Sequence, residues 1–135
     1  MRELDDILMC WIVKAGYDLE TARIEMVLPS ADFDSVAFLC HRASLKFLKA
    51  LMSKFGMKYE PSKSLVYLVE KIAENFRTPH DVLLSASKLD PYQVHRKFPT
   101  ESTRFSTAQI SEIVACAECL RAFTIKSFRS FSERK

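Results

Sequence analysis

The chain has few of the residues that interrupt regular structure, with 2 glycines and 5 prolines among 135 residues. An all-β protein needs many more of them at its turns, and a disordered linker is usually rich in them. No uncharged apolar run approaches the roughly 20 residues of a membrane-spanning helix. These absences exclude an all-β protein and a membrane span, and they favour an all-α protein.

The cysteines are also too few and too scattered to form a disulfide framework, because only Cys10, Cys40, Cys116 and Cys119 are present. No secretory signal precedes them, so we expect reduced thiols in a cytoplasmic protein. Cys116 and Cys119 form a CxxC, but a zinc site needs a second pair or flanking histidines, and neither is present. The sequence predicts no metal and no cofactor.

The formal net charge of +3 is too small to indicate a nucleic-acid-binding protein, but the charge is unevenly distributed. Between residues 42 and 63 the only anion is Glu60, and the cations are Arg42, Lys46, Lys49, Lys54, Lys58 and Lys63. Such a segment attracts a phosphate-bearing ligand or an acidic protein surface. It is equally compatible with a solvated helix face.

Residues 33–55 are expected to form the central helix. On a helical wheel Arg42, Lys46, Lys49 and Ser53 fall within about a sixth of the circumference, and we call the three cations the basic stripe. The rest of the wheel is mostly apolar: Val36, Phe38, Leu39, Cys40, Ala43, Leu45, Phe47, Leu48, Leu51, Met52 and Phe55. A helix so apolar must be nearly surrounded by other elements.

Four further helices are predicted from apolar periodicity and cap signals. The first runs from about Asp5 or Asp6 to Leu28, and Asp32 or a neighbour caps the central helix. The third begins after Ser62 or Ser64 and continues to about residue 76.

The fourth helix is expected to follow Thr78 as its cap and to end at Leu89, and Ser106 and Gln109 form a capping box for the last. These five segments predict an all-α fold, an antiparallel up-and-down four-helix bundle with one additional short helix. We expect a single domain over residues 1–135.

One long segment between the last two helices lacks helical periodicity. It reads DPYQVHRKFPTESTRF and contains Tyr92, His95, Arg96, Lys97, Phe98 and Arg104. Cations and aromatics together suit contact with phosphates and bases, and long ordered loops are often functional. The alternative is a surface loop held by Tyr92 and Phe98 in the core.

Two other pairs of residues carry no clear chemistry. Cys40 and His41 are adjacent in a helix and point about 100° apart, so they do not face each other as nucleophile and base. Asp18 and Glu25 lack the histidine partners of di-metal bundles. We expect Asp18 to form a structural salt bridge with a cation of the central helix such as Lys46.

Three motifs follow one another along the chain: residues 15–22, read AGYDLETA; residues 46–52, read KFLKALM; and Tyr92 followed by Lys97-Phe98-Pro99. Their order resembles that of the higher eukaryotes and prokaryotes nucleotide-binding (HEPN) domain family. The chain departs from the family pattern at His41 and Arg42, where the family has two glutamines, at Leu45 in place of Glu, and at residues 62–65, which replace Thr-His-Asp-Leu.

The resemblance implies a homodimer and a minimal nucleotidyltransferase as partner, in a toxin–antitoxin-like or nucleotide-handling pair. Many members are metal-independent ribonucleases with an Arg followed, after four to six residues, by His. None of His41, His80 and His95 has an Arg at that spacing. The chain is therefore interpreted as a non-catalytic nucleotide-binding or partner-binding module.

Six cations are the predicted phosphate-binding residues, and two alternatives stay open. The cations are Arg42, Lys46, Lys49, Arg96, Lys97 and Arg104. One alternative is a ribonuclease with a rearranged site, in which His95 is the acid–base group and Arg96 holds the phosphate. The other is a purely structural interaction protein. The apolar excess of the first helix and the end of the last helix, with Phe123, Phe128 and Phe131, are expected at a dimer interface.

Overall fold

The computed structural model describes residues 2–61, 63–93 and 106–133, and within these ranges it is all-α, with no strand. The described elements are α1 (Arg2–Met26), α2 (Phe33–Lys54), α3 (Leu65–Ala73), α4 (His80–Leu89), the 3-10 turn η1 (Asp90–Tyr92) and α5 (Thr107–Glu133). The predicted helical bundle is confirmed.

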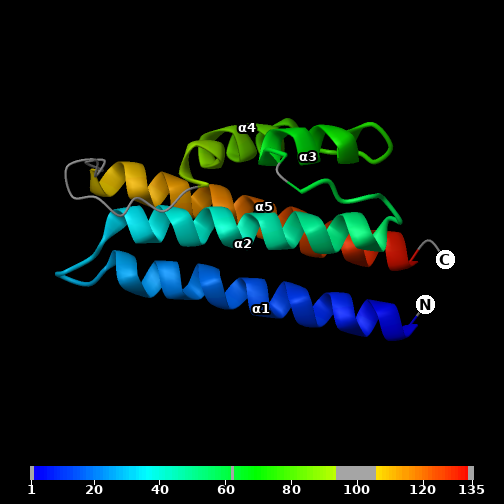
Figure 1. Ribbon diagram of the computed structural model, residues 1–135, viewed down its shortest axis with the longest axis horizontal. Helices are drawn as coiled ribbons and strands as arrows, with labels where there is room; N and C mark the ends of the chain where they lie inside the picture. Colours follow the sequence, from blue (N-terminus) through cyan, green and yellow to red (C-terminus); the bar gives the residue numbers. More distant parts are fainter. Residues whose placement is uncertain (1, 62, 94–105, 134–135) are drawn as a thin grey trace.

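The helices form three layers, with α2 and α5 in the middle (Figure 1). Helix α1 packs along α2 and runs antiparallel to it, and the shorter α3 and α4 together cover the opposite side. Helix α5 runs in the same direction as α2. The fourth position of the bundle is thus filled by two short helices, and α2 is the central helix that its apolar circumference predicts.

The ends of α2 are fixed by local signals. The Asp32 carboxylate accepts hydrogen bonds from the backbone N–H groups of Asp34 and Ser35, so the predicted N-cap is confirmed. After the helix, Gly56 has a φ of +74°. Its N–H donates to the Ser53 carbonyl and that of Met57 to the Met52 carbonyl. This pair of bonds is a Schellman motif, which favours glycine.

Two of the other predicted caps are present. Ser106 and Gln109 form the reciprocal capping box at the start of α5, with donor–acceptor distances of 2.8 and 3.1 Å. Ser64 caps α3 by accepting from the Tyr67 N–H.

The cap predicted at Thr78 is wrong. The Thr78 hydroxyl donates backward to the Phe76 carbonyl, and Pro79 occupies the N-cap position of α4 without a side-chain bond. Because the N-cap position of α4 is one residue later than predicted, the Thr78 side chain does not stand at the capping position.

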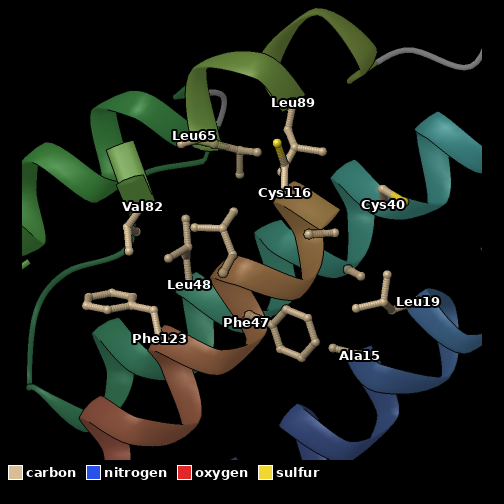
Figure 2. Close-up of a cluster of buried hydrophobic side chains, with 14 of the residues drawn as sticks. Ala15, Leu19, Cys40, Phe47, Leu48, Leu65, Val82, Leu89, Cys116 and Phe123 are labelled. Carbon is tan, nitrogen blue, oxygen red and sulfur yellow. The ribbon is translucent and has the colours of Figure 1, made fainter. Parts of the chain in front are cut away.

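The core is built around α2 (Figure 2). Phe47 faces α1 next to Ala15 and Leu19, whereas Leu48 lies on the side of α2 that faces α3 and α4. All four side chains are 0% exposed. A helix that buries residues on both sides needs neighbours on both sides, which explains its position in the middle layer.

The expected contribution of the α5 phenylalanines to a dimer surface needs correction. Phe123 and Phe128 are 8% and 4% exposed, because they pack inside the chain's own core. Phe131 contacts Phe55 and Phe76. Most of the large apolar residues that are exposed lie on α1 or just after its end instead, and one of them is Trp11, which is 43% exposed.

Candidate functional site

The basic stripe lies on α2 opposite Asp18 of α1. Arg42 donates to both carboxylate oxygens of Asp18, from Nε at 3.1 Å and from Nη2 at 2.9 Å. Lys46 Nζ donates to the same carboxylate at 2.9 Å. The predicted salt bridge between Asp18 and Lys46 is present. The second salt bridge of Asp18, with Arg42, was not predicted. Positions 42 and 46 are one helical turn apart, so both reach one carboxylate.

The local charges favour the ionised form of Asp18. Partial burial works to raise the pKa of its carboxyl, but the hydrogen bonds and charges of Arg42 and Lys46 outweigh it and hold the pKa below the ordinary 3.8. Asp18 is therefore a carboxylate at neutral pH, and it neutralises one of the two cations.

The cations of the basic stripe retain unused hydrogen-bond donors. The side chains of Arg42 and Lys46 are 45% and 47% exposed. An arginine has five N–H donors, and Asp18 occupies two of those of Arg42. A lysine has three, and Asp18 occupies one of those of Lys46. Lys49 is also exposed, and its Nζ lies 5.1 Å from the centre of the Tyr59 ring. The stripe can therefore hold an anion without breaking its bonds to Asp18.

Lys54 belongs to the same basic segment of the sequence but does not continue this surface. Lys54 is 4% exposed at its side chain, forms a 2.7 Å ion pair with Asp5, and lies over the rings of Phe128 and Phe131. Lys63 lies 5.1 Å from the centre of the Tyr67 ring. Within this segment the basic stripe therefore lies on the surface, whereas Lys54 is buried.

The second group of predicted site residues lies outside the described residues. It comprises His95, Arg96, Lys97 and Arg104, which fall within the range 94–105. The phosphate contacts and the rearranged ribonuclease site assigned to them stay predictions.

His41 is a buried histidine on the side of α2 that faces η1. Its Nε2 lies 4.0 Å from Oδ1 of Asp90 and has no hydrogen-bond partner among the described residues. Burial lowers the pKa of His41 below 6.5, and the Asp90 charge opposes this only in part. Asp90 also accepts from the N–H groups of Leu65 and Val66 at the start of α3. His41 is thus a neutral group packed against a capping carboxylate.

Two of the cysteines, Cys40 and Cys116, are buried and harder to ionise than a free thiol. Burial raises the pKa of Cys40 to about 12, and it also raises that of Cys116. All four cysteines are free. Over residues 2–61, 63–93 and 106–133 no group of three or more His, Cys, Asp or Glu side chains could hold a metal ion.

None of the described helices combines the length and the apolar character needed to cross a membrane.

Solved structures resemble the fold over nearly the whole chain. A crystal structure of a protein from Thermus thermophilus has a TM-score of 0.76 at 21% identity, and the match covers 89% of this chain and 97% of that one. A crystal structure described as an archaeal HEPN homologue has a TM-score of 0.73 at 20% identity, and the match covers 90% of this chain and 97% of that one. A crystal structure of a HEPN domain protein from Thermotoga maritima has a TM-score of 0.59 at 18% identity, and the match covers 92% of this chain and 95% of that one.

The sequence comparisons give a family but no characterised relative. Among curated proteins no match to this chain is found. The sequence profile of the HEPN domain matches residues 8–128, which is most of the chain. The chain belongs to the HEPN domain family.

Proposed function

We propose that this chain is a non-catalytic binding module of the cytoplasm that holds an anionic group, a nucleotide phosphate above all, on the basic stripe. One observation carries the proposal: a single carboxylate, Asp18, holds Arg42 and Lys46 side by side with donors left over. Charge-assisted hydrogen bonds from such a pair are stronger than neutral ones. The free thiols of all four cysteines support a reducing compartment.

The partner in this proposal is a minimal nucleotidyltransferase, with which the chain forms a toxin–antitoxin-like or nucleotide-handling pair. The resemblance of residues 15–22 and 46–52 to the HEPN pattern supports this partner. The missing Arg-to-His spacing supports a binding role over ribonuclease chemistry.

We also propose that the module is a homodimer formed through the outer face of α1. Apolar side chains are exposed along this helix and just after its end, at Ile7, Val13, Tyr17, Ile24 and Leu28, with exposed fractions of 44% to 64%. At about 100° per residue, Val13, Tyr17 and Ile24 fall within about 40° of one another on the side of α1 away from its buried residues. Ile7 lies at the edge of this side, and Leu28 follows the end of the helix. An apolar face of this length is typical of an interaction surface.

The proposal is tested by pull-down and by direct binding. The tagged chain, recovered from its source cells, is expected to carry a small nucleotidyltransferase that mass spectrometry identifies. ATP titrated into the purified chain in a calorimeter should bind, and the double variant Lys46→Gln, Lys49→Gln should weaken binding at least tenfold.

The matched control is Lys88→Gln, which removes one exposed cation paired with Glu112 on another face. It should leave the affinity for ATP unchanged. Equal affinities of all three proteins, or no ATP binding at all, would remove the basic stripe as the phosphate site.

A further inference from the structure

A second concave site lies at the end of the bundle where α2, α3 and α5 terminate. Its cavity has a volume of about 490 Å³. We call it the end pocket, and it is lined by Phe55, Phe76, Arg77, Pro79, Phe123, Lys126, Ser127, Ser130 and Phe131. None of these residues belongs to the basic stripe. The size falls within the range of about 300–1,000 Å³ that is common for small-molecule sites.

One wall of the end pocket is aromatic. The rings of Phe55 and Phe76 are stacked with centroids 3.7 Å apart and planes inclined by 16°. Phe131 lies 5.0 Å from Phe55 and 5.8 Å from Phe76. All three side chains are only partly buried, so ring surface is left facing the cavity. Such a surface favours a planar apolar group, because aromatic rings prefer offset or edge contacts with one another.

The aromatic wall is backed by a partly buried ion pair. Lys54 lies behind Phe131, with Nζ 5.6 Å from the ring centre, and it is fixed by the 2.7 Å bond to Asp5. Because Lys54 also contacts the Phe128 ring at 4.8 Å, the end of α5 is anchored to α2 and α1. This anchoring holds the wall in place before any ligand arrives.

The remaining lining is polar and positive. Arg77 and Lys126 are exposed, and neither forms an ion pair with any carboxylate whose side chain the structure describes. The hydroxyls of Ser127 and Ser130 stand on the same face of α5, and none of the lining residues that the structure describes is acidic. Two cations beside an apolar wall select against cations and neutral polar solutes.

From this geometry we propose that the end pocket binds a small organic anion. Its planar aromatic part contacts Phe55, Phe76 and Phe131, and its phosphate or carboxylate is held by Arg77 and Lys126. This ligand site goes beyond the proposed function, because it shares no residue with the basic stripe and needs no protein partner.

The probe for this site is 1-anilinonaphthalene-8-sulfonate, an aromatic ring system with one anionic group, titrated by fluorescence into the folded chain. We expect saturable binding at one site. The double variant Arg77→Gln, Lys126→Gln should lower the affinity at least tenfold. Ser130→Phe, which fills the cavity and leaves both cations in place, should also weaken binding, with near-ultraviolet circular dichroism verifying that each variant is folded.

The matched control is the double variant Lys14→Gln, Lys88→Gln, which removes the same charge from two exposed cations outside both the end pocket and the basic stripe and should bind the probe like the wild type. Displacement of the probe by phenyl phosphate, by phenylacetate or by both supports the proposal and identifies the anionic group. Displacement by neither, non-saturable binding, or unchanged affinity in the Arg77→Gln, Lys126→Gln variant overturns it. These outcomes are independent of the ATP titration of the basic stripe.

Discussion

Asp18 sets the charge of the basic stripe, because one carboxylate is shared by two cations. A ligand phosphate would lie near this carboxylate and be repelled by it. Two unit charges about 4 Å apart in water interact by about 1 kcal/mol, which corresponds to about fivefold in affinity. We therefore expect Asp18→Asn to raise the affinity for ATP about fivefold.

Calorimetric titration of ATP measures this effect, and Asp6→Asn, an exposed carboxylate on the same helix, is the control with the same change in net charge. An affinity that falls in Asp18→Asn would mean that Asp18 is needed mainly to position Arg42 and Lys46.

His41 makes the stability of the fold depend on pH. Since burial lowers its pKa below 6.5 in the folded state, the unfolded chain binds the extra proton more readily. The free energy of unfolding should therefore fall as the pH drops below about 6.5, and His41→Gln should flatten this part of the profile. Urea unfolding at several values between pH 7.5 and about 5 measures the slope.

The exposed His80 provides the control for His41. His80→Gln should retain the wild-type pH profile. If His41→Gln and wild type lose stability in parallel as the pH falls, the dependence arises from other groups.

At the scale of single elements, the Schellman motif at Gly56 fixes where α2 stops. A side chain at this position would meet no atom within 4 Å, so the requirement for glycine comes from its φ of +74° alone. Gly56→Ala should lower the free energy of unfolding by about 1 kcal/mol, because the left-handed region disfavours residues with a Cβ.

Asparagine tolerates the left-handed region better than alanine. Gly56→Asn should therefore be less destabilising than Gly56→Ala in urea unfolding. Equal losses in the two variants would contradict backbone strain at Gly56 as the cause of the lost stability.

The caps show which parts of the structure are readable from the sequence. Asp32, Ser64 and the pair Ser106 and Gln109 act on backbone groups two or three residues away, so the sequence carries the complete signal. Thr78 has the same local signature but turns its hydroxyl to the Phe76 carbonyl. The Thr78 hydroxyl can bond either to the Phe76 carbonyl or to the N–H groups at the start of α4. The geometry of the turn decides between them, and the residue types alone do not specify this geometry.

The candidate sites follow the same distinction between local and distant contacts. The basic stripe is one face of one helix, and its helical spacing made it predictable. The end pocket joins Phe55, Phe76 and Phe131, which are brought together only by packing of three helix ends. Lys54 was grouped with the surface cations because its partner Asp5 is 49 residues away.

At the scale of the whole molecule, the proposed homodimer through the outer face of α1 can be tested by the assembly state. In solution the 15.5 kDa chain is expected to have twice its own mass by size-exclusion chromatography with light scattering. The double variant Tyr17→Glu, Ile24→Glu places two charges on this face and should give a monomer, because burying unpaired charges in an interface is unfavourable.

Leu84 is 47% exposed on α4, far from α1 in the layered arrangement (Figure 1), and Leu84→Glu is the control that should leave the dimer intact. A monomeric wild-type chain contradicts the proposed dimer. A dimer that Leu84→Glu disrupts and the α1 variant does not would place the interface on α4.

The layer made of α3 and α4 has a consequence for the order in which the molecule opens. Helices of 9 and 10 residues are too short to persist alone, so this layer depends on its packing against α2 and α5. Native-state hydrogen exchange should show the α3 and α4 amides exchanging through a sub-global opening at lower free energy than the α2 amides around Phe47. The antiparallel α1–α2 pair with α5 would then be the last cooperative unit to lose protection, and the first to acquire it during folding.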